Sequence, residues 1–361
     1  SLLIKDGKIQ KIGKVKEKDL ITLPDNYVVC PGFIDEHIHG AAGSDAMDGT
    51  YEALENIAGA LAKEGTTAFL ATTMTQSVEN IDKALKAVND YIKQNPETGA
   101  RILGVHLEGP FISKDFVGAQ PIEYVQTPNV QAYKHYEEAS GDNIKLVSLA
   151  CEVEGAKELI SYLASKKTVA SIGHSNAKYA DVEMAVNAGA TSITHTYNAQ
   201  KPIHHREVGT VGSAMLFDEL NCEAICDGIH LSAPAIRLLY KNKPADKFTL
   251  ITDAMRAKHM PDGDYELGGQ PVIVKNNEAR LHDGTLAGSV LKMNLAVKNI
   301  MSFLNIDLSQ AVRCATINPA KNLGVDDVMG SIKEGKYANF AVLDENQNVV
   351  MTIREGNIIF K

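Results

Sequence analysis

The chain has 361 residues, of which 44% are hydrophobic and 22% are charged. This composition is typical of a globular protein and excludes a disordered or low-complexity chain. The 36 Lys and Arg against 45 Asp and Glu leave a net charge of −9, which argues against a general affinity for nucleic acid or anionic membranes. No apolar run approaches the roughly 20 residues that a membrane helix needs, and residues 1–19 carry no signal segment, so we expect a cytoplasmic protein.

The two ends of the chain carry the same hairpin signal. Residues 4–9 (IKDGKI) and 353–358 (IREGNI) are apolar stretches that are each broken by an acidic residue followed by glycine. Further strands are expected at Asn339–Leu343 and Val349–Ile353. The termini are therefore predicted to form β-structure together.

We predict two domains from this pattern. Residues 1–30 and 336–361 would form a small β-sandwich domain. Residues 31–335 would form the central domain, with a β-rich insertion near residues 261–286. The five cysteines are scattered and lack a CxxC pair, so we expect reduced thiols and neither a disulfide framework nor a thiolate zinc site.

In the central domain, eight β-rich runs alternate with segments of helical periodicity. This is the count of a (β/α)8 barrel. A doubly wound open sheet is the rival fold, but no GxGxxG motif opens any of the helices. The expected strands are Val29–Asp35, Thr67–Thr72, Ile102–Leu107, Ile144–Cys151, Thr168–Gly173, Ser192–Thr196, Glu223–Asp227 and Phe248–Thr252. The expected helices are Tyr51–Glu64, Val78–Gln94, Glu154–Lys166, Tyr179–Ala188, Ala233–Lys241, Met293–Leu304 and Leu308–Leu323.

Polar residues follow the C-terminal ends of six of these strands, where a (β/α)8 barrel builds its functional site. His37 and His39 are one residue apart, so on a strand both rings face one side and can chelate one metal ion. Several imidazoles with carboxylates suit zinc, iron(II) or manganese, and such an ion lowers the pKa of bound water to about 7. The candidate ligands are His37, His39, Glu108, His174, His195 and Asp253.

Six motifs follow one another along the chain: PGFIDEHIHG (31–40), HLEGPF (106–111), THTYNA (194–199), REVG (206–209), DGIHL (227–231) and TDA (252–254). Their order resembles the amidohydrolase superfamily and, within it, the N-acetylglucosamine-6-phosphate deacetylase family. The likeness covers nearly the whole chain. It implies hydrolysis of the acetamide of N-acetyl-D-glucosamine 6-phosphate to glucosamine 6-phosphate and acetate, in amino-sugar catabolism and recycling.

The resemblance also implies a centre of two divalent transition-metal ions, zinc or iron, with manganese or cobalt as alternatives. Asp253 would be a ligand and the catalytic residue, acting as general base toward the hydroxide nucleophile and as general acid toward the departing nitrogen. The ligands divide into His37, His39 and Asp253 for one ion and His174 and His195 for the other, with Glu108 bridging them.

Substrate-binding residues follow from the same resemblance. Arg206 fits the phosphate because its planar guanidinium can bind in a bidentate way, whereas the roles of His204 and His205 stay open. Family members often carry histidine where this chain has Gln120, whose amide can donate a hydrogen bond but carries no charge. The other implied contacts are Ala119, Asn198, Ala199, His230, Leu286 and Ala287.

Two alternative functions remain open. The chain could be another amide hydrolase of the superfamily, such as a dihydroorotase-like enzyme or an amino-acid deacetylase, although a phosphosugar explains Arg206 better. It could instead be a non-catalytic barrel scaffold, although such a protein would lack several of the metal ligands. We expect a small phosphosugar substrate, no nucleic-acid or membrane partner, and a homodimer with the phosphate pocket near the subunit contact.

Overall fold

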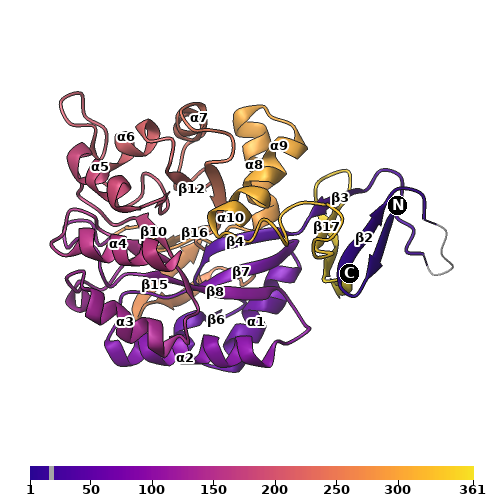
Figure 1. Cartoon of the computed structure of the whole chain (residues 1–361), viewed down its shortest axis with the longest axis horizontal. Helices are drawn as coiled ribbons and strands as arrows, with labels where there is room; N and C mark the ends of the chain where they lie inside the picture. Colours follow the sequence, from indigo (N-terminus) through magenta and orange to yellow (C-terminus); the bar gives the residue numbers. More distant parts are fainter. Residues whose placement is uncertain (16–19) are drawn as a thin grey trace.

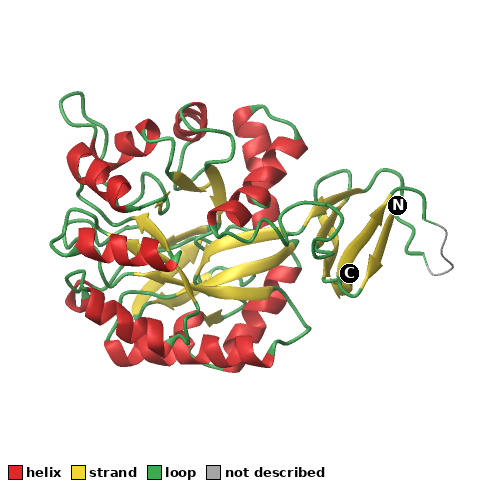
Figure 2. Cartoon of the chain, viewed as in Figure 1, coloured by secondary structure: helices red, strands yellow, loops and turns green. Residues whose placement is uncertain are grey.

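The computed structural model describes residues 1–15 and 20–361. Its centre is an eight-stranded parallel sheet rolled into a nearly closed barrel, in which each strand pairs with the next along the chain (Figures 1 and 2). The predicted (β/α)8 fold is confirmed. The barrel strands are β4 (Phe33–Ile38), β7 (Thr66–Thr72), β8 (Arg101–Glu108), β9 (Ile144–Leu149), β10 (Val169–Ile172), β11 (Ser192–Ile193), β12 (Asn221–Ile225) and β13 (Phe248–Ile251).

Hydrogen bonds beyond the strand ends join the first barrel strand to the last. The backbone N–H of Asp253 donates to the carbonyl of His37 at 2.9 Å. The buried carboxylate of Asp35 accepts from both the backbone N–H and the hydroxyl of Thr252, at 3.3 and 2.5 Å. These contacts fix the residues that follow β13 against the residues of β4, and both segments carry candidate ligands.

Helices cover the outside of the barrel, and their apolar faces pack on the strands (Figure 2). The helix α2 illustrates why they form: Ser77 caps its first turn, and Ile81, Leu85 and Val88 recur at helical spacing and are buried. The helices are α1 (Tyr51–Ala62), α2 (Val78–Gln94), α3 (Val130–Ala139), α4 (Ala156–Lys166), α5 (Tyr179–Ala188), α6 (Gly209–Leu216), α7 (Ala233–Lys241), α8 (Met293–Leu304), α9 (Leu308–Cys314) and α10 (Ile317–Asn322). Short 3-10 helices occupy η1 (Ala46–Asp48) and η2 (Ile122–Tyr124).

Two predicted elements are each divided in the structure. The strand expected at Val29–Asp35 breaks at Gly32, where a Cβ atom would clash with the side chain of Thr67. The helix expected at Leu308–Leu323 breaks into α9 and α10, because Pro319 has no N–H to continue the hydrogen-bond ladder across the junction. The helices α3 and α6 were not predicted.

The chain termini form the sheets at one end of the molecule (Figure 1). β1 (Leu2–Lys5) pairs with β2 (Lys8–Ile12), and a separate antiparallel sheet has the order β19-β18-β17-β3. Both predicted hairpin turns are present, at Asp6-Gly7 and Glu355-Gly356, and all four residues have positive φ. The strands of the second sheet are β3 (Val28–Pro31), β17 (Phe340–Leu343), β18 (Val349–Arg354) and β19 (Asn357–Phe360).

Two smaller sheets complete the described chain. The insertion after β13 is a three-stranded antiparallel sheet, which packs its apolar side on Met74 and Met255 near the barrel mouth. The strands are β14 (Gly263–Leu267), β15 (Gln270–Lys275) and β16 (Glu278–Arg280) in the insertion, and β5 (Gly40–Ala41) and β6 (Ser44–Asp45) in the other sheet.

All five cysteines are buried and unpaired. Within residues 1–15 and 20–361, no helix is both long and apolar enough to cross a membrane.

Candidate metal centre and active site

Glu108, the last residue of β8, lies at the centre of a cluster of histidines. Its Oε1 is 3.0 Å from Nε2 of His195, 3.1 Å from Nε2 of His174 and 3.5 Å from Nε2 of His37. Its Oε2 is 3.2 Å from Nε2 of His39. The carboxylate therefore faces four imidazoles that come from three other segments of the barrel mouth.

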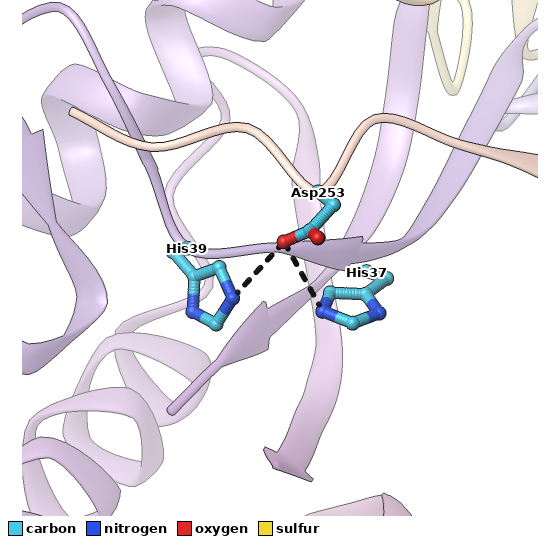
Figure 3. A group of neighbouring side chains, drawn as sticks. All are labelled: His37, His39 and Asp253. Atoms are coloured by element: carbon cyan, nitrogen blue, oxygen red, sulfur yellow. Dashed lines mark ion pairs between the residues drawn. The ribbon is translucent and has the colours of Figure 1, made fainter. Parts of the chain in front are cut away.

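Asp253 approaches the same cluster from the residues that follow β13. One oxygen, Oδ1, lies 3.2 Å from Nε2 of His39 and 3.5 Å from Nε2 of His37 (Figure 3). The structure thus brings all six candidate ligands together at the C-terminal ends of the strands. They form two groups whose ligand atoms lie within 4.8 Å of one another, namely His37, His39 and Asp253, and Glu108, His174 and His195.

The hydrogen bonds around the cluster suit a metal centre. His37 Nδ1 lies 3.0 Å from the carboxylate of Glu223, and His174 Nδ1 lies 2.9 Å from the carbonyl of Phe116. Both partners are acceptors, so each ring can keep a proton on Nδ1 and present Nε2 to a metal ion. The Nε2 atoms of His174 and His195 are 3.1 Å apart, an approach that a shared cation explains. These donors fit divalent transition-metal ions.

The electrostatics of the cluster also favour positive charge. Burial alone would raise the pKa of Glu108, but the charge of His37 and hydrogen bonds from His174 and His195 hold it well below its usual range. Burial opposes protonation of His39, yet the carboxylates of Asp253 and Glu108 raise its pKa to about 10. The carboxylates therefore stay ionised and create a potential that attracts cations.

Three candidate ligands have unusual backbone conformations. His174, His195 and Asp253 each lie two residues after the end of a strand and have φ values of 47°, 28° and 47°. Residues other than glycine rarely adopt positive φ, and such strain persists where the surrounding structure holds it for a functional purpose. The strain turns each side chain from its strand into the barrel mouth.

The cluster opens into a cavity of about 350 Å³ at the barrel mouth. The wall includes the loops after β7, β8, β11 and β12 and the insertion after β13. His37 lies behind the cavity, and Ala287 is fully buried beside it. The lining residues are His39, Met74, Glu108, Gly118, Ala119, Gln120, His174, His195, Asn198, Ala199, His230, Asp253, Leu267, Arg280, Thr285, Leu286 and Gly288.

Comparison with known proteins agrees with this architecture. The model of the amidohydrolase family matches residues 28–359. The chain belongs to the amidohydrolase family. It is 42% identical to the N-acetylglucosamine-6-phosphate deacetylase of Bacillus subtilis (strain 168), over 99% of this chain and 92% of that protein. It is 35% identical to the N-acetylgalactosamine-6-phosphate deacetylase of Escherichia coli O157:H7, over 99% of this chain and 94% of that protein.

A solved structure supports the same relationship. The crystal structure of N-acetylglucosamine-6-phosphate deacetylase from Thermotoga maritima superposes with a TM-score of 0.90 at 39% sequence identity. The match covers all of this amidohydrolase and 94% of that chain.

Gln120 of this amidohydrolase is buried in the wall of the cavity. Its Nε2 donates to Oε2 of Glu108 at 2.9 Å, and its Oε1 accepts from the backbone N–H of Thr75 at 2.7 Å. The backbone N–H can only donate, so it assigns which end of the amide is oxygen. Gln120 therefore orients Glu108.

Arg206 lies on an exposed loop and is absent from the lining of the cavity. Its Nη1 is 2.7 Å from Nε2 of His205, which is also exposed. His230 does reach the cavity, and its Nδ1 donates to Asp227 at 2.7 Å. The carboxylate fixes the ring and leaves Nε2 for a ligand.

Two residues of the site were missed by the sequence analysis. Glu223 contacts His37, but it lies inside β12, two residues before the strand ends, and belongs to none of the motifs. Arg280 lines the cavity from the insertion, and its guanidinium is bonded to Glu278 and to the carbonyl of Gly284. For Arg280, the sequence offered one signal of a role in the site, namely its position in the β-rich insertion.

Proposed function

We propose that this amidohydrolase removes the acetyl group of N-acetyl-D-glucosamine 6-phosphate and releases glucosamine 6-phosphate and acetate. The observation that carries the proposal is the position of Asp253 and Glu108 at the floor of the cavity, beside four imidazoles. The named deacetylases among its relatives support the substrate class.

We propose two divalent transition-metal ions per chain, zinc or iron, with manganese or cobalt as alternatives. His37, His39 and Asp253 would hold one ion, His174 and His195 would hold the other, and Glu108 would contact both. When bound, such ions lower the pKa of water and withdraw charge from the carbonyl oxygen of the acetamide.

Asp253 has the position and charge for proton transfer. Burial would raise its pKa, but the charges of His37 and His39 and the hydrogen bond from His39 lower it, so Asp253 is an ionised base at neutral pH. Its Oδ1 faces His37 and His39, while the side chain keeps limited contact with the cavity. Asp253 would take a proton from water and then deliver it to the departing nitrogen.

The remaining lining residues would bind the sugar and its phosphate. Ala119, Asn198 and Ala199 line the cavity with His230. Leu286 also lines the cavity and would pack near the acetyl methyl, with Ala287 buried behind it.

Arg206 is proposed as a partner of the phosphate. The loop of Arg206 is exposed and lies outside the cavity lining. We propose that a homodimer contact at this loop brings Arg206 near the phosphate of the bound substrate. The variant Arg206→Ala should raise KM for the phosphorylated sugar more than it lowers kcat. A size measurement by light scattering tests the homodimer.

A substrate panel tests the function. Purified protein with added Zn²⁺ should release acetate from N-acetylglucosamine 6-phosphate far faster than from N-acetylglucosamine. Equal rates on both sugars would contradict a phosphosugar site. The Escherichia coli relative makes N-acetylgalactosamine 6-phosphate a second candidate substrate, so it belongs in the panel. Less than one metal ion per chain together with no acetate release would indicate a non-catalytic scaffold.

A further inference from the structure

Glu223 lies on β12, inside the barrel and directly behind the metal-binding groups. Its side chain is fully buried. A single oxygen, Oε2, accepts from His37 Nδ1 at 3.0 Å and from the backbone N–H of His195 at 3.0 Å. Glu223 reaches neither Glu108 nor the lining of the cavity, so it touches the ligands without facing the substrate.

The two donors belong to different metal-binding groups. His37 lies in the group with His39 and Asp253, and one of its ring nitrogens also lies within 4.8 Å of ligand atoms of His106 and Glu223. His195 lies in the group with Glu108 and His174. One carboxylate oxygen therefore fixes the ring of a ligand in the first group and the backbone of a ligand in the second. We propose that Glu223 is a positioning residue that sets both metal-binding groups at once. This rests on the proposed metal centre but not on the proposed substrate.

The bond to His37 determines how that ring binds metal. A carboxylate acceptor keeps the proton on Nδ1, so Nε2 presents its lone pair to the ion, and a negatively charged acceptor also makes the imidazole a stronger ligand. The ring of His106 packs edge-on against His37 with centroids 4.4 Å apart and limits its rotation from another side.

The bond to His195 acts on the backbone. His195 has a φ of 28°, a conformation that an ordinary residue does not hold without support. The acceptor on its N–H supplies that support from the neighbouring strand. Loss of Glu223 would therefore change the backbone conformation of His195. The side chain of His195 would then point in a different direction, which disturbs the second group.

A series of Glu223 variants separates the effect of the hydrogen-bond acceptor from the effect of the negative charge. Glu223→Met keeps much of the side-chain volume but removes the acceptor. Glu223→Gln keeps an oxygen that can accept both hydrogen bonds but removes the charge. Asn221→Ala is the matched control, since Asn221 lies on the same strand, is buried and bonds to Glu36 and Thr249, not to a metal ligand.

The full chain loaded with Zn²⁺ is titrated with a chromogenic chelator, and the affinity for the ion is measured without any substrate. We expect Glu223→Met to weaken Zn²⁺ binding by about 10- to 100-fold, Glu223→Gln by about 3- to 10-fold, and Asn221→Ala by less than about twofold. With Co²⁺ as the probe, the visible absorption of Glu223→Met should shift while that of Asn221→Ala stays unchanged.

Wild-type affinity in a folded Glu223→Met would overturn the proposal, and so would an equal loss in Asn221→Ala. If Glu223→Met does not fold, Glu223→Gln decides the matter by itself, because wild-type affinity in that variant contradicts the predicted order. Failure of the proposed function is a separate result, in which Zn²⁺ binds tightly and no acetate is released.

Discussion

Gln120 lines the cavity and donates from Nε2 to Oε2 of Glu108 at 2.9 Å, and its oxygen accepts from the backbone N–H of Thr75. The family resemblance implies a substrate contact at this position, where family members often carry histidine. In this chain the amide oxygen and one amide N–H are already bonded, so Gln120 holds in place a carboxylate that faces four histidines, and its second N–H is left for a ligand in the cavity.

The variant Gln120→Ala should lower kcat by about tenfold, because it leaves Glu108 Oε2 without its donor and loosens the ligand that contacts both metal-binding groups. Acetate release and bound metal are measured on the same sample. Gln126→Ala is the control, since Gln126 donates to Tyr136 and does not contact the site. Unchanged kcat in Gln120→Ala would show that the bond has no role in turnover.

Asp253→Asn should keep most of its metal and lose turnover by about 10²- to 10⁴-fold. The amide oxygen can still face His37 and His39, but an amide can neither take nor return a proton at neutral pH. Elemental analysis and acetate release give the two quantities. If the metal content of Asp253→Asn falls in proportion to its activity, Asp253 acts only as a metal ligand and not in proton transfer.

The positions of the candidate metal ligands could be predicted because they follow from the fold. Buried runs and helical periodicity indicated eight alternating units, and the ends of parallel strands in a barrel converge on one mouth. His174 and His195 could therefore be placed together although they lie on different strands. The two turns of Asp6-Gly7 and Glu355-Gly356 were predictable because local conformational preferences determine them.

Other features could not be predicted because tertiary contacts alone determine them. The helix α6 is rich in small residues and is buried on nearly all sides, so it shows no amphipathic pattern. Glu223 has no motif around it, and only the pairing of β12 with β11 brings it beside His195. Whether Arg206 lines the cavity depended on the course of a loop, which the residue sequence does not specify.

Zn²⁺ should raise the Tm of the chain, because the ligand atoms come together only in the folded state. At a free concentration 100 times Kd each bound ion contributes about 2.7 kcal/mol, which corresponds to roughly 3–4 °C per ion for a chain of this length. Differential scanning fluorimetry with Zn²⁺ and with a chelator measures the difference. His195→Ala removes a ligand of one of the two groups and should lose about half of this response, and an undiminished response would place the Zn²⁺ elsewhere.

His259 should make the wild type lose stability as the pH falls. Burial and the charge of Lys258 lower its pKa to about 4 in the folded chain, from an ordinary value near 6.5. Between these values the unfolded chain binds a proton that the folded chain does not, so unfolding becomes easier toward low pH. Glu64, 4.0 Å away, contributes in the opposite direction, because burial raises its own pKa to about 7 and the folded chain takes up a proton there as the pH falls. Comparison of the wild type with a His259 variant therefore isolates the contribution of His259.

The variant His259→Gln removes this contribution to the pH dependence of stability. Between pH 7 and pH 4.5 the wild type should lose about 2 kcal/mol more unfolding free energy than the variant. Urea unfolding at several pH values measures the difference. His282→Gln, at an exposed position, is the control and should follow the wild type. Parallel curves for the wild type and His259→Gln would contradict the prediction.

Arg280 should contribute to the binding of an anionic substrate, because it is the one Lys or Arg that lines the cavity in the part of the chain that the structure describes. Glu278 and the carbonyl of Gly284 hold its guanidinium, each at 2.7 Å. Arg280→Ala should raise KM for the phosphorylated sugar by about three- to tenfold and change kcat less than about twofold, since an exposed charge acts mainly on binding.

High salt should diminish the effect of Arg280→Ala, because its side chain is 41% exposed and screening weakens its attraction for the phosphate. Steady-state kinetics at low and high ionic strength measure this dependence. Arg237→Ala is the matched control, since Arg237 is bonded to the carbonyl of Phe303 and lies outside the cavity lining. If KM for the unphosphorylated sugar rises as much as KM for the phosphorylated one, Arg280 shapes the insertion and does not act through its charge.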